Sequence, residues 1–370
     1  MKIGVPKEIK TEEYRVGMTP FSVHEAVSHG HHVMVEHGAG LGIGFGDESY
    51  REAGAAIGKS AKEVWEFAEM IVKVKEPQSS EFSFLRENLV LFTYLHLAPD
   101  AKQADALLKS GCVAIAYETV TDAKGGLPLL SPMSQVAGRL SVQVGSTALE
   151  KSHGGSGVLL GGVPGVYPGK ITVIGGGVVG TNAVRMAMGR EATVTVLDTS
   201  LHRLQELDLQ FGGRLNTVYS TIASLAEHVT SADLVIGAVL IPGRAAPKLI
   251  PRSLLSQMKP GSVIVDVAID QGGCLETSRA TTHAAPTFVV DGVVHYCVAN
   301  MPGAVPRTAT LALNNATLPY VMRLANLGFQ KALRDDAFFR SGLNVCRGAV
   351  TNEDVAGALS KDYVPAMDIL

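Results

Sequence analysis

Three glycines between residues 171 and 198 give the clearest chemical signal in the sequence. An apolar segment at 171–174 runs into Gly175, Gly177 and Gly180, spaced G-x-G-x-x-G, and a helical pattern follows. The first glycine permits a tight turn, the second lets the backbone approach a pyrophosphate, and the third lets helix and strand pack closely. Unpaired N–H groups at the start of the helix present positive charge to phosphates. The pattern predicts a dinucleotide site.

A carboxylate follows the next expected strand, 193–197, at Asp198. In this position it accepts hydrogen bonds from both hydroxyls of a ribose and repels a 2′-phosphate, which favours NAD over NADP. A lone G-x-G-x-x-G also occurs in ordinary tight turns. Here strand, turn, helix, strand and terminal acid all agree, and together they predict NAD binding.

Three further side chains stand where expected strands end. Arg15 follows the strand at 3–5, Lys75 ends the strand at 70–74 and shares a face with Lys73, and His96 follows the strand at 89–94. An arginine offers a planar fork to a carboxylate, and histidine exchanges protons near neutral pH.

Each of these residues also has an ordinary interpretation: a solvated surface arginine, a polar strand terminus and a satisfied core histidine. Because ligands bind at the carboxyl ends of open parallel sheets, convergence at one edge favours a functional site.

A fourth candidate, Asp270, comes just after the strand at 263–267 and before the pair Gly272 and Gly273. This placement predicts an acid at the same crevice, although an aspartate there also caps turns through its side chain. The irregular stretch beginning at Asn300 is expected to point into that crevice as well. The histidines and cysteines form no H-E-x-x-H or C-x-x-C motif, so no metal site is predicted.

Strands and helices alternate through most of the chain, which predicts parallel sheets with crossover helices. Further strands are expected at 32–35, 113–117, 171–174, 217–219, 234–238 and 294–298, and helices at 21–29, 99–110 and 310–333. Residues 131–152 predict one long helix that begins at Ser131 and Pro132.

The fold class expected is α/β, with two Rossmann-like doubly wound domains and a cleft between them. Residues 1–130 plus 306–370 would form a discontinuous substrate domain, completed by the C-terminus folding back. Residues 131–305 would form the NAD-binding domain, entered by the helix at 131–152.

Composition limits the class of protein. The 370 residues suffice for roughly two to three domains. The net charge of −3 gives the protein no overall positive potential that would attract nucleic acid, so nucleic acid is not an expected partner. Without an apolar run of 18 or more residues, no membrane span is expected. The N-terminal segment lacks the apolar core of a signal peptide, and the four cysteines are widely spaced, so we expect a cytoplasmic enzyme. A hydrophobic fraction of 46% hints at subunit interfaces.

The motifs, in order and spacing, resemble those of the bacterial L-alanine dehydrogenase and transhydrogenase alpha-subunit family over essentially the whole chain. The resemblance lies in MKIGVPKEIKTEEYRVGMTP, VKVKEP, TYLHLA, SPMSQVAGRLSVQ, GKITVIGGGVVGTNA, DVAIDQGGC and HYCVANMPGAVPRTAT. It implies reversible oxidative deamination of L-alanine to pyruvate and ammonium, with NAD taking the hydride. It also implies a homohexamer, with the helix at 131–152 as a subunit contact.

The same resemblance implies residue roles. Arg15 would bind the substrate carboxylate with help from Lys75, His96 would donate and accept protons, and Asp270 would handle the attacking water. Cofactor contacts implied by the glycine turn or the resemblance are Ser134, Gly175, Gly177, Val178, Val179, Gly180, Asp198, Arg203, Ser220, Val239, Leu240, Val267, Ala268, Ile269, Asp270, Arg279, Val298, Ala299, Asn300 and Met301. Arg203 stands where a lysine is usual. Some members carry an acid and a histidine where this chain has Arg323 and Leu327, so no metal site is carried over.

The residues agree with this chemistry. Removing hydride from an amine-bearing carbon creates a cationic imine, to which water adds before ammonia leaves. His96 can serve each proton transfer, while the cationic pair orients the substrate and domain closure excludes water. The alternatives are the soluble NAD-binding component of a transhydrogenase, a related amino-acid dehydrogenase such as a saccharopine-forming one, and a catalytically silent NAD sensor. A transhydrogenase component would come with membrane segments or a partner subunit, and a sensor would not need the four polar residues together.

Overall fold

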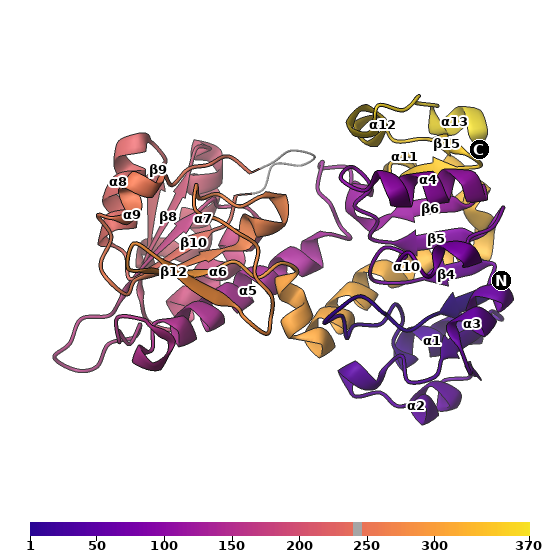
Figure 1. The fold of residues 1–370 in the computed structure, drawn as a ribbon, viewed down its shortest axis with the longest axis horizontal. Coiled ribbons are helices and arrows are strands. Elements are labelled where there is room, and N and C mark those ends of the chain that lie inside the picture. The colour runs from indigo at the N-terminus through magenta and orange to yellow at the C-terminus, as the bar shows by residue number, and fades with distance from the viewer. Residues whose placement is uncertain (240–245) are drawn as a thin grey trace. The chain divides into compact units, whose positions relative to one another are not determined.

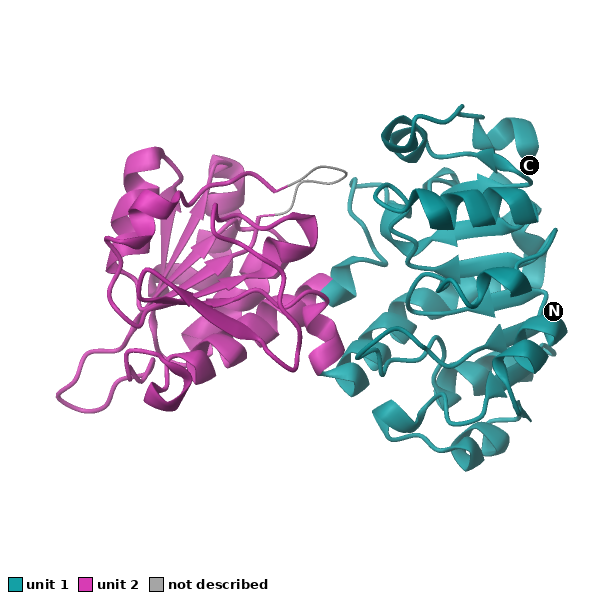
Figure 2. Ribbon diagram, in the orientation of Figure 1, with its two compact units in different colours: residues 1–133, 305–370 teal, residues 134–304 magenta. Residues whose placement is uncertain are grey.

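The computed structural model describes residues 1–239 and 246–370 and contains two compact units. Unit 1 comprises Met1–Met133 and Val305–Leu370, and unit 2 comprises Ser134–Ala304 (Figure 2). The boundaries expected from the sequence, after residues 130 and 305, lie beside these. Helix α5 (Ser131–Ala148) begins in the last residues of the first segment of unit 1 and continues into unit 2.

Unit 1 is built on a sheet of eight strands in the order β15-β14-β6-β5-β4-β1-β2-β3 (Figure 1). Six strands are parallel: β1 (Lys2–Val5), β2 (His32–Glu36), β3 (Ala56–Gly58), β4 (Met70–Val72), β5 (Val90–Thr93) and β6 (Val113–Ala116). Strands β4, β5 and β6 are buried throughout, as expected for a parallel sheet covered on both faces. The strand order reverses between β1 and β4: after β1 the chain adds β2 and β3 on one side of the sheet, and after β4 it adds β5 and β6 on the other side.

The C-terminal part of the chain completes unit 1. Strand β14 (Leu343–Cys346) pairs antiparallel with β6, and β15 (Ala349–Val350) pairs with β14. The long helix α10 (Pro306–Arg334) contains a break at Gly328, whose φ is 74°. The remaining helices of the unit are α1 (Pro20–Ser28), α2 (Asp47–Glu52), α3 (Ala61–Phe67), α4 (Ala101–Ser110), α11 (Ala337–Arg340), α12 (Glu353–Leu359) and α13 (Ala366–Ile369), with 3-10 turns η1 (Leu41–Ile43), η2 (Phe82–Phe84) and η3 (Tyr117–Thr119). Helices α3, α4 and α12 share one buried apolar cluster with the sheet.

Unit 2 contains a sheet of seven strands in the order β12-β13-β11-β10-β7-β8-β9. The strands are β7 (Lys170–Ile174), β8 (Thr193–Asp198), β9 (Leu215–Tyr219), β10 (Leu234–Gly237), β11 (Val263–Asp266), β12 (Thr287–Val290) and β13 (Val293–Tyr296). All neighbours are parallel except β12 and β13. The strand order reverses between β7 and β10, so the glycine turn after β7 stands at the switch point.

The helices of unit 2 follow its strands. They are α6 (Val178–Gly189), α7 (Leu201–Phe211), α8 (Ile222–Ser231) and α9 (Arg252–Leu255), with 3-10 turns η4 (Lys151–His153), η5 (Gly212–Arg214), η6 (Val267–Gln271) and η7 (Met301–Ala304). Helices α8 and α9 pack on β7, β10 and β11 through a buried apolar cluster. In the part of the chain that the structure describes, no helix is both long and apolar enough to cross a bilayer.

The prediction of two Rossmann-like, doubly wound α/β domains is confirmed by these two sheets. Two differences concern the borders of the sheets and the long helix. Strands β3, β12, β14 and β15, which lie at or next to the edges of the sheets, were not expected, because such short strands carry little apolar pattern. The helix expected over 131–152 ends at Ala148.

Candidate functional site

The glycine turn of unit 2 has the geometry that its spacing predicts. Gly175 adopts a φ of 96°, which only glycine adopts without strain. A side chain on Gly180 is sterically excluded, since its Cβ would lie 1.8 Å from the carbonyl oxygen of Gly175. Gly177 caps helix α6, and no heavy atom lies within 4 Å of the position that its Cβ would take. The space above Gly177 and the N-terminus of α6 therefore suits a pyrophosphate.

Asp198, the last residue of β8, ties the glycine turn to the neighbouring strand. Its Oδ2 accepts a hydrogen bond of 2.7 Å from the Gly176 N–H, and its Oδ1 accepts one of 2.8 Å from Ser200. Arg203 donates from Nε to the Gly176 carbonyl at 2.7 Å and from Nη2 to the Thr181 hydroxyl at 2.6 Å. The carboxylate and the guanidinium thus both belong to the rim of the turn.

The other predicted cofactor residues of unit 2 lie along strand ends and helix starts. Val178 and Val179 open α6, Ser220 follows β9 and donates its N–H to the Asp198 carbonyl at 2.9 Å, and Val239 follows β10. Ser134 lies in α5, and Arg279 stacks 4.2 Å from the Phe288 ring centroid. Leu240 lies outside the described residues.

Asp270 lies in η6, the 3-10 turn that follows β11 and also contains Val267, Ala268 and Ile269. It is exposed, and its carboxylate accepts the N–H of Asn300 at 3.2 Å. Asn300 has a left-handed φ of 57° and stands in the stretch of Val298, Ala299, Asn300 and Met301 after β13. The structure thus brings the ends of β11 and β13 together at the carboxyl edge of unit 2.

Arg15 in unit 1 is buried, with 2% of its surface exposed, so the interpretation as a solvated surface residue is wrong. Glu13 binds it in a bidentate pair: Nε donates to Oε1 at 2.7 Å and Nη2 to Oε2 at 2.6 Å. Burial raises the pKa of Glu13, but hydrogen bonds and charge from Arg15, together with Lys75, outweigh it and lower this pKa to about 2. The acid therefore stays ionised and fixes the plane of the guanidinium.

The two lysines after β4 have different environments. Lys73 is completely buried, with Nζ 2.9 Å from Glu81 Oε1 and 3.2 Å from Glu8 Oε2. Lys75 is partly buried, and its backbone N–H donates to Glu8 Oε1 at 3.2 Å. Burial raises the pKa of Glu8, with smaller contributions from the Glu13 and Glu81 charges, and this outweighs the lowering by Lys73 and the Val74 N–H. Lys73 is therefore a structural ion-pair residue, and Glu8 binds the backbone that carries Lys75.

His96 follows β5 and has a left-handed φ of 49°. Its ring is stacked on the Tyr94 ring, with centroids 5.8 Å apart and an interplanar angle of 7°. The imidazole is about half exposed, so the interpretation as a core histidine is wrong. The Tyr94 hydroxyl donates to the Leu129 carbonyl at 2.6 Å. A stacked, half-exposed imidazole can exchange protons with a ligand.

These residues of unit 1 follow three neighbouring strands of one sheet: Lys75 and His96 come just after β4 and β5, and Arg15 lies in the longer loop after β1. Electrostatic coupling agrees. Burial raises the pKa of the Tyr94 hydroxyl, and the positive charge of Arg15 acts against that shift. Tyr94 is thus influenced by the charge of Arg15 and is stacked on the His96 ring. The edge offers two cations and a proton-exchanging group to an anionic ligand.

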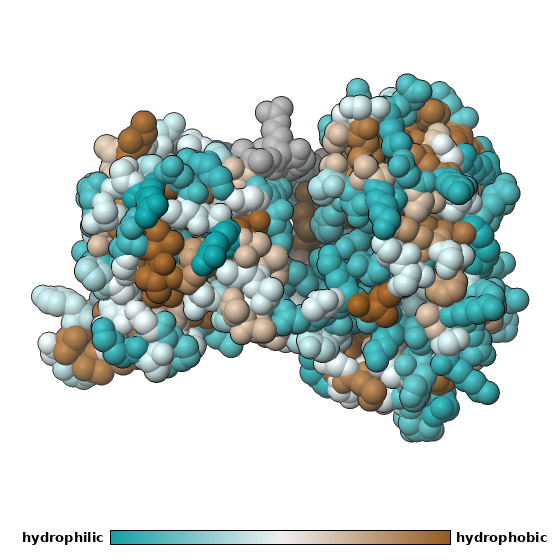
Figure 3. Space-filling view, in the orientation of Figure 1, coloured by the Kyte–Doolittle hydropathy of each residue, from teal (hydrophilic) through white to brown (hydrophobic). Residues whose placement is uncertain are grey.

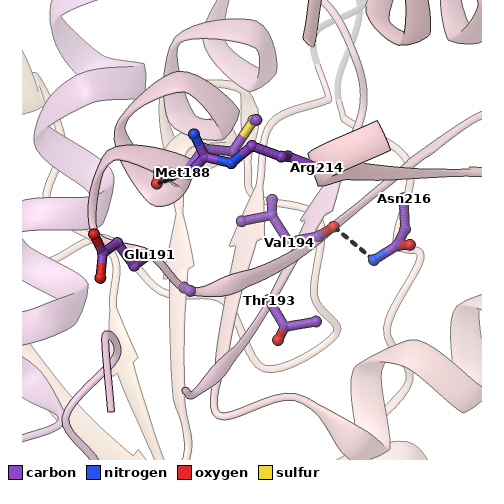
Figure 4. A pocket seen from close by; sticks show the side chains of 7 residues that line it. Met188, Glu191, Thr193, Val194, Arg214 and Asn216 are labelled. Atoms are coloured by element: carbon purple, nitrogen blue, oxygen red, sulfur yellow. Dashed lines mark hydrogen bonds between the residues drawn. The ribbon is translucent and has the colours of Figure 1, made fainter. Parts of the chain in front are cut away.

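A hollow in unit 2 contains none of the predicted cofactor residues in its lining (Figure 4). It is lined by Met188, Glu191, Ala192, Thr193, Val194, Arg214 and Asn216. Asn216 donates to the Val194 carbonyl at 3.1 Å across it. Thr193 begins β8, so the hollow lies at the amino ends of the strands, opposite to the edge where parallel sheets bind ligands.

The described residues contain no group of three or more histidine, cysteine, aspartate or glutamate side chains placed to hold a metal ion. Arg323, at the position where some family members have an acid, donates to Asp336 Oδ2 at 2.7 Å. The Arg323 guanidinium thus forms an ion pair with the Asp336 carboxylate.

Sequence reasoning missed the carboxylates that hold the predicted residues, namely Glu8, Glu13 and Glu118. Glu118, just after β6, accepts the N–H groups of Leu95 and His96. The pattern E-x-R at Glu13 was the only signal in the sequence, since Glu8 and Glu118 reach their partners across neighbouring strands.

Two family models match the chain: "Alanine dehydrogenase/PNT, N-terminal domain" over residues 4–137 and "Alanine dehydrogenase/PNT, C-terminal domain" over residues 141–353. Among curated relatives, alanine dehydrogenase of Halomonas elongata is 59% identical over 370 residues, covering 100% of both chains. Alanine dehydrogenase of Bacillus subtilis is 56% identical, with 99% of this chain and 97% of the relative covered.

Solved structures of similar proteins agree with these matches. An L-alanine dehydrogenase superposes with a TM-score of 0.95 at 54% identity, covering 97% of this chain and 99% of the other. A transhydrogenase from Sinorhizobium meliloti superposes with a TM-score of 0.84 at 27% identity, covering 95% of this chain and 100% of the other.

Proposed function

The chain belongs to the alanine dehydrogenase family, and we propose that it catalyses the reversible, NAD-dependent oxidative deamination of L-alanine to pyruvate and ammonium. The observation that carries the proposal is the convergence of Arg15, Lys75 and His96 after three neighbouring strands of unit 1. Two cations beside a proton-exchanging group suit a small amino acid, whose carboxylate must be held while its nitrogen changes protonation.

NAD is the cofactor that the residues of unit 2 fit. The uncrowded Gly177, the N-terminus of α6 and the Asp198 carboxylate would hold the pyrophosphate and the adenosine ribose. When bound, the nicotinamide supplies a hydride acceptor. Because Asp198 is negatively charged at the rim of the turn, a 2′-phosphate in its place would be repelled, and NADP is disfavoured.

In the proposed mechanism, Arg15 and Lys75 bind the substrate carboxylate and so fix Cα. Glu13 fixes the orientation of the guanidinium through its bidentate pair. His96 takes a proton from the substrate ammonium, which leaves the neutral amine that can lose hydride from Cα.

The second half of the reaction consumes water. Loss of hydride gives an iminium ion, and water adds to its carbon with a proton passing to Asp270, since His96 still holds the proton taken from the ammonium. The carbinolamine then breaks its C–N bond. Nitrogen leaves as ammonia after protonation by His96, and the neutral His96 then takes the hydroxyl proton as the carbonyl of pyruvate forms. We propose that both units are needed, since Asp270 belongs to unit 2 and His96 to unit 1.

A coupled-substrate assay tests the activity. Oxidation of NADH is measured with pyruvate plus ammonium, with 2-oxoglutarate plus lysine, and with NADPH in place of NADH. The proposal requires turnover with pyruvate, ammonium and NADH, and little with the other pairs. Turnover only with 2-oxoglutarate and lysine would contradict it and support a related amino-acid dehydrogenase.

The similarity to a transhydrogenase structure makes transhydrogenation the second candidate. Reduction of an NADP analogue by NADH, without pyruvate or ammonium, distinguishes it. If that reaction proceeded while alanine formation did not, the second candidate would replace the first.

We also propose that the enzyme is a cytoplasmic homo-oligomer, a hexamer by family resemblance. Apolar side chains gather on the loop between η4 and β7, where Leu159, Val163, Val166 and Tyr167 are 67%, 54%, 62% and 95% exposed (Figure 3). Exposed apolar clusters support a subunit contact. All four cysteines are free and buried, which suits a reducing compartment. Light scattering of the purified protein measures the assembly, and a monomer would contradict the proposal.

A further inference from the structure

Glu118 lies just after β6, and its carboxylate binds the backbone that carries His96. Oε1 accepts the His96 N–H at 2.6 Å and the Leu95 N–H at 3.1 Å, while Oε2 lies 3.2 Å from the same Leu95 nitrogen. Glu118 is half-buried, and its side chain is 15% exposed. The contact joins the carboxyl ends of two neighbouring strands, β5 and β6.

The bound backbone has an unfavourable conformation. His96 has a φ of 49°, in the left-handed region that a residue with a Cβ adopts rarely and at an energetic cost. Two consecutive N–H groups converge on one anion, an arrangement that forms a binding concavity for negative charge. The Glu118 carboxylate supplies that charge and stabilises the bend at His96.

The same carboxylate lies beside the imidazole ring. Glu118 Oε1 is 3.9 Å from His96 Nδ1. The second contact that restricts the His96 ring is its stacking on the Tyr94 ring. Glu118 therefore limits both the backbone and the ring of a side chain that is otherwise half exposed. Because Nδ1 is the ring nitrogen that faces Glu118, Nε2 is the nitrogen at the far side of the ring from this carboxylate.

We propose that Glu118 is a positioning residue for His96: it holds the left-handed bend after β5 so that the imidazole reaches the substrate. The proposal rests on the proposed function, in which His96 transfers protons. Glu118 acts only through His96, and substrate binding through Arg15 and Lys75 does not depend on it.

Two substitutions of nearly equal size separate hydrogen bonding from packing. Glu118→Gln keeps an oxygen that can accept both N–H groups, whereas Glu118→Met fills the same space with no acceptor oxygen. Glu69→Ala is the control, since Glu69 also accepts a backbone N–H, that of Lys2 at 2.7 Å, but at the amino ends of the strands of the same sheet. Measurements are kcat, KM for L-alanine and NADH affinity by fluorescence.

We expect Glu118→Met to lower kcat by roughly 100-fold, the size of effect that a displacement of about 1 Å produces at a reacting group. KM for alanine and NADH affinity should change by less than about threefold. Glu118→Gln should keep kcat within about fivefold of the wild type, because only the charge of the hydrogen bonds is lost. Glu69→Ala should keep kcat within about twofold.

Three outcomes would overturn the proposal: a kcat for Glu118→Met within twofold of the wild type, an equal loss in Glu118→Gln, or a rise in KM at unchanged kcat. If Glu118→Met does not fold, Glu118→Asp decides, since the shorter carboxylate keeps its charge but cannot reach both N–H groups. An undiminished kcat in Glu118→Asp would then reject the positioning role.

His96→Ala, assayed in parallel, separates this proposal from the proposed function. If His96→Ala turns over normally, the role of His96 itself is wrong. If His96→Ala is inactive and Glu118→Met is fully active, the function stands and only the positioning role fails.

Discussion

At the scale of single residues, carboxylates determine how the predicted catalytic and binding groups are held. Glu13 fixes Arg15, Glu8 binds the backbone before Lys75, and Glu118 binds the backbone of His96. Each contact is charge-assisted and partly or fully shielded from water, where such hydrogen bonds are strongest. The orientation of the site therefore depends on the carboxyl oxygens of these three side chains as hydrogen-bond acceptors.

The pair of Glu13 and Arg15 predicts a pH dependence of stability. The pKa of Glu13 is about 2 in the folded state, against 4.5 as the ordinary value. The unfolded chain therefore binds more protons between these values, so stability from this pair is complete above pH 4.5 and is lost as the pH falls towards 2. The shift corresponds to about 3 kcal/mol.

Urea unfolding of the wild type and of Glu13→Gln measures this contribution. We expect the two free energies of unfolding to differ by about 3 kcal/mol at pH 7 and to converge near pH 2. Subtraction removes neighbouring groups such as Glu8, whose raised pKa acts in the opposite direction. A difference that stayed constant from pH 7 to pH 2 would show that the Glu13 charge does not stabilise the fold.

At the scale of elements, the glycine turn between β7 and α6 combines a folding requirement with a binding requirement. Gly180 is required by the fold, since any Cβ would collide with the Gly175 carbonyl. Gly177 has open space and a φ of −65°, which alanine also adopts. The two glycines of one motif therefore have separable effects.

Alanine substitutions should reveal this separation. Gly180→Ala should destabilise the protein by several kcal/mol, because the clash is with backbone. Gly177→Ala should keep the melting temperature within about 2 °C and weaken NADH binding by roughly tenfold or more, because its methyl group takes the space of the pyrophosphate. Thermal melts and NADH fluorescence titrations measure both. Equal NADH affinity in Gly177→Ala and the wild type would place the pyrophosphate elsewhere.

At the scale of the whole molecule, the six parallel strands of each sheet follow the same order, but the two sheets carry different chemistry at their switch points. Unit 1 presents cations and an imidazole, and unit 2 presents a glycine turn and a carboxylate. This division predicts that substitutions at the cations of unit 1 change alanine binding, and that substitutions at the glycine turn of unit 2 change NADH binding.

Arg15→Lys tests the division from the substrate side. Lysine lacks the planar fork that binds Glu13 and a carboxylate together, so KM for alanine should rise by at least about tenfold. NADH affinity should stay within about twofold, in contrast to Gly177→Ala. If Arg15→Lys weakened NADH and alanine binding equally, the assignment of separate roles to the units would be wrong.

The sequence was sufficient for the elements that carry a strong pattern. Buried parallel strands such as β5 and β10 are continuous apolar runs, and the glycine spacing located the turn before α6. Since parallel strands end at one edge, the positions of Arg15, Lys75 and His96 at the edge of unit 1 could be predicted as well.

Contacts across neighbouring strands could not be predicted. The partner of His96 is 22 residues away, and the partner of Lys75 is 67 residues away, so both depend on strand order and register. Lys73 and Lys75 looked equivalent in sequence, but Lys73 is completely buried between two carboxylates, whereas Lys75 is only partly buried. Strand β14 was not predicted, because it is short and its partner β6 lies more than 200 residues earlier in the sequence.

The most direct test of the account is turnover of His96→Ala and Asp270→Ala in the pyruvate, ammonium and NADH assay, with NADH affinity measured on the same samples. The account predicts that each variant loses roughly 100- to 10,000-fold in kcat, the contribution of a positioned acid–base group, while NADH affinity changes by less than about threefold. Turnover within a few-fold of the wild type in either variant would contradict the role assigned to that residue.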